Sequence, residues 1–284
     1  MPIDVPVATG LTVPEQEFHW TEADARRYRH AVGQSTRQHG LLPTFAMTAP
    51  GAFGVASPDF YHSRPPEIRF PGITLSLATL LQQEQELRVH TALPESGSAR
   101  CRSRVLGIED RGTAAVLVQR TELLGADGTL LVSGISRIHA RGEGTAAGSA
   151  ARPVAAATPA RPPDAEVVVR TDREQAVRYQ RCGKNNSLHD NVHTDPAFAR
   201  AAGLDGPIMQ GVCTYGMVCA ALVDTVLDAD IARLRGFTGR FTGIVFPGDS
   251  LRIRIWTGDG EYHYRTTVPG REDRSVLSGV LQAR

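Results

Sequence analysis

Residues 179–227 read YQRCGKNNSLHDNVHTDPAFARAAGLDGPIMQGVCTYGMVCAALVDTVL, and this stretch decides the fold. Its last part, residues 211–227, is mostly small and apolar, has no proline and carries few charges, which predicts a buried helix of about four turns. Asp195 followed by Pro196 is typical of the start of a shorter helix, with aspartate as the N-cap and proline in the first turn. A helix that is apolar on nearly all sides needs an apolar sheet face around it.

Strand-like segments follow the predicted helix and supply such a sheet, at residues 234–241, 250–256, 261–268 and 275–282. Turn residues separate them, as in Pro247-Gly248-Asp249. Ahead of the helix, residues 166–170 are read as a short strand. Thr171-Asp-Arg-Glu174 is a capping-box pattern, which predicts a helix that runs to about residue 179.

The first half of the chain follows the same plan. Residues 20–32 are expected to form a helix, because Thr21 is a suitable N-cap and acidic residues lie in the first turn. The sequence 125–128, GADG, is turn-like and predicts an antiparallel hairpin between its two flanking strands. The strand-like segments of this half are residues 83–90, 99–108, 113–124 and 130–140. Each half is therefore read as helices before an antiparallel meander, an α+β class with internal duplication.

A linker separates the two halves. Residues 143–163, EGTAAGSAARPVAAATPARPP, contain almost no large apolar residue and cannot bury a core. The predicted organisation is an N-terminal repeat at 1–142, the linker at 143–163 and a C-terminal repeat at 164–284. A chain of 284 residues is long enough for two such domains.

Composition narrows the function classes. The formal net charge is +1 and both signs are mixed along the chain, so no basic stripe is evident and nucleic acid is not expected as a partner. No run approaches the roughly 20 apolar residues of a membrane span, and the first ten residues lack the pattern of a signal peptide. A cytoplasmic location without membrane association is therefore expected. The four cysteines form no CxxC pair, so neither a metal site nor a disulfide framework is predicted.

The spacing of residues 179–216 resembles the signature of the MaoC-like, or hydratase 2, family of (R)-specific enoyl-thioester hydratases. That signature has tyrosine, three residues and Gly-Asp-x-Asn-Pro-Leu-His, then x-Asp-Pro and later a Pro-Ile-Leu-His-Gly-x-Cys-Thr element. The matching residues are Tyr179, Gly183, Asn186, Leu188, His189, Asp195, Pro196, Pro207, Ile208, Gly211, Cys213, Thr214 and Gly216.

The resemblance implies a double hotdog fold, in which two tandem repeats each wrap a long helix in a curved antiparallel sheet. In the first half, residues 42–45 and 81–86 (LQQEQE) look like the substrate-binding repeat of members that have two repeats. The first repeat is therefore expected to accommodate the acyl chain, and the second to carry the site.

The resemblance also implies a chemistry. Adding water to an enoyl thioester needs a base for the water, a proton for Cα and stabilisation of the enolate oxygen, and an imidazole suits proton transfer near neutral pH. By likeness, His189 is the base, Asn186 lies beside it, and the Gly211 amide at the helix start stabilises the enolate. The residues expected to bind substrate around them are Tyr179, Gly183, Gln210 and Cys213.

The sequence departs from the family signature at the acid. Lys184 stands where the family has aspartate, and four extra residues follow His189. A second register is therefore open, which makes His193 the base but keeps fewer matches, so His189 is preferred. In a third interpretation, Asp190 folds back and replaces the lost acid. A protonated lysine cannot hold water as a carboxylate does, but it can donate a proton or stabilise an enolate.

These expectations describe a hydratase or dehydratase of enoyl or 3-hydroxyacyl thioesters in fatty acid or polyketide metabolism, with the acyl group on coenzyme A or an acyl carrier protein. No cofactor is expected, because coenzyme A or phosphopantetheine belongs to the substrate. Two alternatives stay open: a repurposed hotdog enzyme (a cyclase, an isomerase or a thioester-processing enzyme) and a non-catalytic acyl-thioester-binding subunit. The two halves can cover each other within one chain, so both a monomer and a homodimer are open.

Overall fold

The structure is a computed structural model that describes residues 3–50, 67–76, 79–144, 159–183 and 187–284. The helices in these ranges are α1 (Val5–Ala8), α2 (Glu22–Val32), α3 (Gln175–Gln180), α4 (Pro196–Ala201) and α5 (Gly211–Val226), with 3-10 helices η1 (Pro43–Thr48), η4 (Ile231–Arg233) and η5 (Pro269–Arg271). The strands of the first half are β1 (Thr12–Trp20), β2 (Glu67–Phe70), β3 (Ile73–Ser76), β4 (Leu80–Val89), β5 (Gly97–Asp110), β6 (Ala114–Gly125) and β7 (Leu130–Arg141). Those of the second half are β8 (Ala165–Arg170), β9 (Leu234–Phe241), β10 (Ser250–Thr257), β11 (Glu261–Val268) and β12 (Arg274–Ala283).

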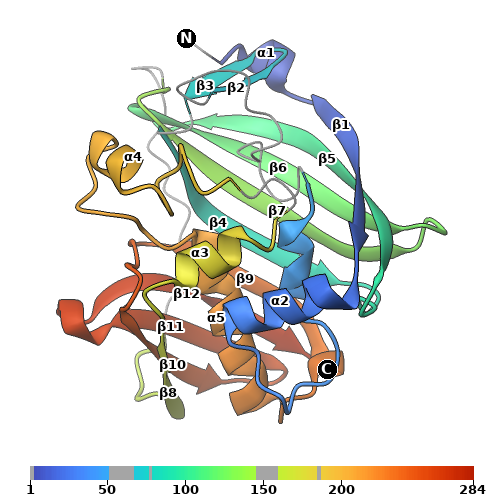
Figure 1. Cartoon of the computed structure of the whole chain (residues 1–284), viewed down its shortest axis with the longest axis vertical. Helices are drawn as coiled ribbons and strands as arrows, with labels where there is room; N and C mark the ends of the chain where they lie inside the picture. The colour runs from blue at the N-terminus through green and yellow to red at the C-terminus, as the bar shows by residue number, and fades with distance from the viewer. Residues whose placement is uncertain (1–2, 51–66, 77–78, 145–158, 184–186) are drawn as a thin grey trace.

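One antiparallel sheet of ten strands runs through both halves, in the order β1-β5-β6-β7-β4-β9-β12-β11-β10-β8. Strands β4 and β9 join the halves, and Gln85 pairs with Gly239 at this joint. Outward from the joint, each side contains five strands from one half of the sequence, as the colours of Figure 1 show. This is the double hotdog arrangement that the resemblance implied.

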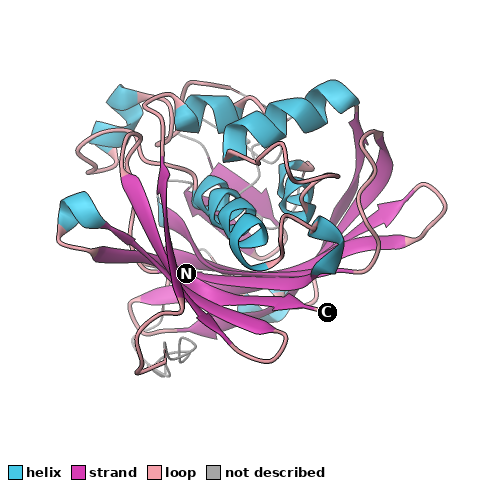
Figure 2. Cartoon of the chain, turned by 90° about the horizontal axis from the view of Figure 1, so that it is seen from below, coloured by secondary structure: helices cyan, strands magenta, loops and turns pink. Residues whose placement is uncertain are grey.

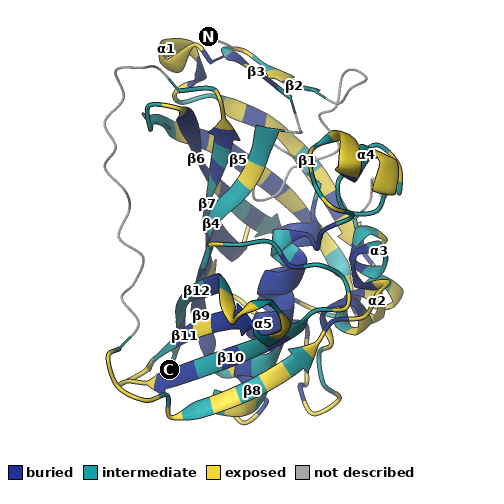
Figure 3. Cartoon of the chain, turned by 90° about the vertical axis from the view of Figure 1, so that its left-hand side faces the viewer, coloured by how far each residue is buried: buried dark blue, intermediate teal, exposed yellow. Residues whose placement is uncertain are grey.

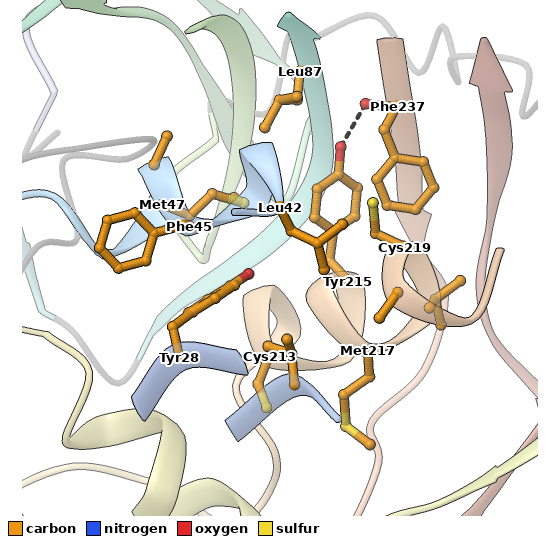
Figure 4. Close-up of a cluster of buried hydrophobic side chains, with 14 of the residues drawn as sticks. Tyr28, Leu42, Phe45, Met47, Leu87, Cys213, Tyr215, Met217, Cys219 and Phe237 are labelled. Carbon is orange, nitrogen blue, oxygen red and sulfur yellow. Dashed lines mark hydrogen bonds between the residues drawn. The ribbon is translucent and has the colours of Figure 1, made fainter. Parts of the chain in front are cut away.

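The sheet curves around the central helix α5, and Figure 2 shows this helix lying inside the curve. Most of its residues are buried, because it is apolar on nearly every side. The Tyr215 hydroxyl donates a hydrogen bond to the Phe237 carbonyl of β9 (Figure 4). A Cβ on Gly239 would lie 2.8 Å from the Tyr215 ring, so glycine allows β9 to pass directly beneath the helix.

The core around α5 is built from both repeats. Phe45 of η1 and Tyr28 of α2 pack edge to face with ring centroids 5.4 Å apart, and both belong to the same buried cluster as Tyr215. Figure 4 shows these side chains converging with Leu87 of β4 on one side of α5. In the described part of the first repeat, the helices are α2 and the short α1 and η1, and a long central helix is seen only in the second repeat.

Most predicted elements are confirmed. The helix at 20–32 is α2, where Thr21 caps the Asp24 amide and the Asp24 carboxylate accepts from the Thr21 amide. The predicted hairpin is β6 and β7, which pair antiparallel. Buried and exposed residues alternate along β5, as Figure 3 shows in its colours. The predicted strands of the second half correspond to β8 to β12.

The predicted capping box at 171–174 is wrong. Helix α3 begins only at Gln175 after Glu174, and Glu174 makes no side-chain cap. The Thr171 hydroxyl is used in a tertiary contact instead, where it donates to the Asp249 carbonyl and accepts from the Gly248 amide, each at 2.8 Å. The contact anchors the turn between β9 and β10 to the end of β8.

Strand β1 was not predicted. It lies at the edge of the sheet, contains Pro14, and shifts register between Val13 and Gln16, so its apolar alternation is interrupted. Its pairing with β5 is the first-repeat counterpart of β8 pairing with β10. None of the helices described is long and apolar enough to cross a membrane.

Candidate active site

Helix α5 begins at Gly211, the residue expected to stabilise an enolate. Among the described residues no side chain caps this helix end: Gln210 holds the N-cap position, but its Nε2 donates to the Ala176 carbonyl at 3.0 Å and to Gln180 Oε1 at 3.1 Å. Uncapped amides in the first turn carry a partial positive charge, which favours a developing oxyanion. A Cβ at Gly211 would lie 3.1 Å from Phe241 Cε1, so glycine allows the helix start to lie against that ring.

A compact turn carries both candidate histidines. Its centre is the buried side chain of Asn191, whose Nδ2 donates to the Ser187 carbonyl at 3.2 Å and to Thr194 Oγ1 at 2.9 Å. Asn191 Oδ1 accepts from the amides of His193 at 2.9 Å and Thr194 at 3.0 Å. Because this amide uses both of its ends, the backbone on either side of it is held in one conformation.

Asp195 ends this turn and begins α4. Its Oδ1 accepts from the amides of Ala197 and Phe198, which confirms the predicted N-cap, with Pro196 in the first turn. The hydrogen bond from the Phe198 amide is the main reason that the pKa of this carboxyl lies below its usual value. Asp190 adopts a left-handed φ of 59°, and its amide donates to Asp195 Oδ2 at 3.1 Å. The expected role of Asp190 as a substitute acid stays a prediction.

His193 is half-buried against the segment that leads into α5. Its Nδ1 lies 3.0 Å from the Ile208 carbonyl, and the Ile208 amide donates to the Val192 carbonyl at 3.1 Å. A carbonyl only accepts hydrogen bonds, so Nδ1 carries the proton and Nε2 keeps its lone pair. Burial lowers the pKa of His193 to about 4, so the ring is neutral at pH 7.

His189 lies in a different environment. It is exposed, its amide donates to Ser187 Oγ at 3.2 Å, and within the described residues its ring makes no hydrogen bond. The structure therefore places His193, rather than the preferred His189, against Ile208, three residues before the long helix begins. The assignment of the base stays a prediction for both residues.

Two expected site residues, Lys184 and Asn186, lie outside the described residues. Gly183 is half-buried directly after α3, and Tyr179 of α3 packs against Tyr28 with ring centroids 6.1 Å apart. The Tyr179 hydroxyl is buried and has no hydrogen-bond partner in the ranges that the structure covers, and burial raises its pKa well above the usual value. The expectation that Tyr179 and Gly183 bind substrate stays a prediction.

The cysteines are core residues. Cys213 is fully buried, with its thiol 3.9 Å from the Ala31 carbonyl of α2, which favours a packing role over contact with substrate. Burial raises the pKa of Cys182 to about 12, so this thiol is protonated at neutral pH and is a poor nucleophile. Among the residues described, no three His, Cys, Asp or Glu side chains are grouped so as to hold a metal ion.

Three features of the site were not predicted from the sequence: the Ile208 carbonyl, the Phe241 ring and the Asn191 amide. The first two depend on tertiary contacts. Asn191 could have been found, because asparagine next to aspartate in a polar stretch is typical of a turn built on side-chain hydrogen bonds.

The chain is similar along almost its whole length to characterised proteins. Residues 18–142 match the MFE-2 hydratase 2 N-terminal domain, and residues 154–277 match the MaoC like domain. The enoyl-CoA hydratase ChsH3 of Mycobacterium tuberculosis is 37% identical over 99% of this chain and 98% of that protein. The chain belongs to the MaoC-like hydratase 2 family.

Further members of the family are similar to this chain over nearly its whole length. The 3-hydroxyacyl-thioester dehydratase Y of Mycobacterium tuberculosis is 33% identical over 96% of this chain and 94% of that protein. A solved MaoC-like dehydratase from Phytophthora capsici superimposes with a TM-score of 0.80 over 98% of this chain and 97% of that one, at 23% identity. This MaoC-like chain therefore has both repeats of its relatives, and the fold agrees with theirs.

Proposed function

We propose that this protein is a hydro-lyase, which adds water to the double bond of a trans-2-enoyl thioester and removes it from the 3-hydroxyacyl thioester in the reverse direction. The observation that carries the proposal is the neutral His193, held by the Ile208 carbonyl next to the uncapped start of α5. The full-length similarity to an enoyl-CoA hydratase supports coenzyme A as the carrier. The proposal also includes an acyl carrier protein as the alternative carrier and a cytoplasmic location for the protein.

The chemistry needs three contributions, and the chain offers a group for each. His193 Nε2 takes a proton from water as the water oxygen bonds to Cβ, and the double-bond electrons move to the thioester oxygen as an enolate. The Gly211 amide and the positive end of α5 stabilise that oxygen. The imidazolium then returns a proton to Cα, so that water has been added and the base is regenerated.

Lys184 stands at the position of the family's acid in the register that makes His189 the base, whereas the register of His193 puts Leu188 at that position. In both registers the family's aspartate is absent, so we propose that the water is held differently in this protein. A lysine near the reacting atoms contributes positive charge, which would add to the stabilisation of the enolate by the helix start. This part of the proposal rests on the sequence alone.

The test is hydration of a short trans-2-enoyl-CoA, which is monitored through the loss of the absorbance of the conjugated thioester. We expect the native protein to be active and His193→Ala to lose roughly 10²–10⁴-fold in kcat, as is usual when a general base is removed. His189→Ala is the matched control and should stay within a few-fold of the native rate. If His189→Ala is inactive and His193→Ala is not, the other register is correct. If the native protein hydrates no enoyl thioester, the proposed function is wrong.

Two further substitutions examine the remaining parts of the site. Gly211→Ala should lower kcat, because the added methyl displaces the helix start from Phe241. Lys184→Asp restores the family's acid, and a gain in hydration rate would show that Lys184 occupies the acid position. An unchanged rate would place Lys184 away from the reacting atoms.

A further inference from the structure

A row of polar side chains crosses the concave face of the first repeat. Gln85 of β4 pairs with Ser136 of β7, and Ser136 pairs with Gln119 of β6, so the three residues lie side by side on neighbouring strands. All three are buried, with exposed fractions of 1% or less. The Ser136 hydroxyl donates to Gln85 Oε1 at 2.7 Å, and Gln119 Nε2 donates to Thr121 Oγ1 at 3.2 Å. We refer to Gln85, Ser136 and Gln119 as the polar row.

The polar row faces the same interior as the candidate active site. Gln85 pairs with Gly239 of β9, and a Cβ on Gly239 would touch the Tyr215 ring of α5. Two residues further along β9, Phe241 lies against Gly211 at the start of that helix. The row therefore begins beside the helix start and leads away from it across the first repeat.

The polar row separates two apolar regions of the core. Leu87 and Leu123 on one side belong to the main cluster around α5, whereas Leu117 and Ile138 on the other side belong to a second cluster beneath the β2–β3 hairpin. A continuous core would have apolar residues between them, since burying polar side chains is unfavourable unless they are hydrogen-bonded.

Gln119 is not fully hydrogen-bonded. Its Oε1 is buried and has no partner among the described residues. Turning the amide over does not remove the deficit. The oxygen would then face Thr121 Oγ1, and the NH₂ group would take the place that has no partner. A completely buried amide with one unused end is a place where a ligand or a water molecule completes the hydrogen bonding.

We infer that the polar row binds a hydroxyl group carried by the acyl chain of the substrate, far from the thioester. This inference rests on the proposed function and identifies the substrate class as hydroxylated long-chain or bulky enoyl thioesters. A hydroxyl group suits Gln119 in either orientation, because it donates to Oε1 or accepts from Nε2. A plain hydrocarbon chain in the same place leaves the amide end unpaired, and sites of this kind discriminate against such ligands.

The register of the sheet gives the position of the hydroxyl group. From Phe241 on β9 to Gln119 on β6 there are three strand-to-strand steps, at about 4.8 Å each, and an offset of two residues along β9, about 7 Å, so the separation is about 16 Å. An extended chain advances about 1.2 Å per bond, since three backbone bonds span about 3.5 Å. The hydroxyl group is therefore expected about thirteen bonds from the thioester carbon.

The experiment compares three trans-2-enoyl-CoA substrates of equal length: one plain, one with a hydroxyl about six bonds from the thioester, and one with a hydroxyl about thirteen bonds away. We expect the third to exceed the plain substrate about tenfold in kcat/KM, the value of one neutral hydrogen bond, and the second to show no gain. Gln119→Leu should remove the preference by lowering kcat/KM for the third substrate alone. Ser136→Ala, a smaller change in the same row, should reduce the preference.

A matched control is Thr266→Val. Thr266 is also fully buried with an unpartnered oxygen, but it lies on β11 in the second repeat. Removing the Thr266 hydroxyl should leave the preference intact. The control therefore distinguishes a general effect of deleting a buried oxygen from the loss of a binding group. Equal kcat/KM for all three substrates, or a preference that survives Gln119→Leu, overturns the inference.

Failure of the proposed function is distinguishable from failure of this inference. If no substrate is hydrated, the saturated analogues of the same three thioesters are titrated by calorimetry. Binding about tenfold tighter for the analogue with the hydroxyl about thirteen bonds away, lost in Gln119→Leu, keeps the inference and rejects the hydratase function. Equal binding of all three analogues rejects the inference as well.

Discussion

Acidification should destabilise this protein through His193. Burial lowers the pKa of His193 to about 4 in the folded protein, whereas a histidine in an unfolded chain titrates near 6.5. The unfolded chain therefore binds the proton more tightly, and stability that is present above about pH 6.5 is lost as the pH falls toward about 4. The difference between these two pKa values corresponds to a loss of about 3 kcal/mol in the free energy of unfolding at pH 4.

The measurement is urea unfolding at several pH values between about 7 and 4, for the native protein, His193→Gln and His189→Gln. Groups that all three proteins share, such as carboxylates and the partly buried His139, contribute equally and cancel in the comparison. His193→Gln should lose about 3 kcal/mol less than the native protein over this range, because glutamine does not titrate. His189→Gln is the control, because it replaces an exposed histidine of the same turn.

Parallel pH profiles for the native protein and His193→Gln would refute the reasoning, because they would mean that His193 titrates alike in the folded and unfolded states.

The same pKa of His193 predicts the acid limb of the pH profile of kcat/KM. Activity that depends on neutral His193 should persist below pH 6 and fall toward about pH 4, whereas a limb near 6.5 would indicate an exposed base.

Three other outcomes are expected. Tyr215→Phe should lower the free energy of unfolding by about 1 kcal/mol, because it removes the donor to the Phe237 carbonyl; an unchanged urea midpoint would contradict this. Glu84→Gln should lower the free energy of unfolding by about 2 kcal/mol, because it breaks the 2.8 Å ion pair with Arg240 at the β4–β9 joint. Salt screens ion pairs, so a destabilisation that disappears at low salt would contradict this. Cys182 should resist alkylation in the native protein at pH 8 and react in urea, since burial raises its pKa to about 12; rapid native labelling, located by peptide mass, would show that the thiol is accessible.

Local signals explain what could be predicted of the fold. Thr21 and Asp195 cap helices through side chains that act within three residues, so their patterns identified α2 and α4. The apolar stretch of α5 identified the central helix for a similar reason. Thr171 failed as a predicted cap because its hydroxyl bonds Asp249, a residue 78 positions away, and tertiary contacts of this kind override a local pattern.

The candidate site depends more on long-range contacts. The proposal of His193 over His189 rests on the Ile208 carbonyl, 15 residues from His193, and an alignment of motif residues does not contain that information. The polar row depends on the register of three strands, which places Gln119 and Gln85 on the two sides of Ser136 although they are far apart in the sequence. The motif predicted the kind of site, and the tertiary contact of His193 supports its proposed role there.

The joint between β4 and β9 has a consequence for the synthesis of the chain. Glu84 and Arg240, which meet across it, are separated by 156 residues. At about 5–20 residues per second, a ribosome needs roughly 8–30 s to produce β9 after β4 has been made. During that interval the nascent first repeat presents an unpaired strand edge, which is a template for mispairing with other chains. Folding in the cell should therefore depend on chaperones that shield this edge until the second repeat emerges.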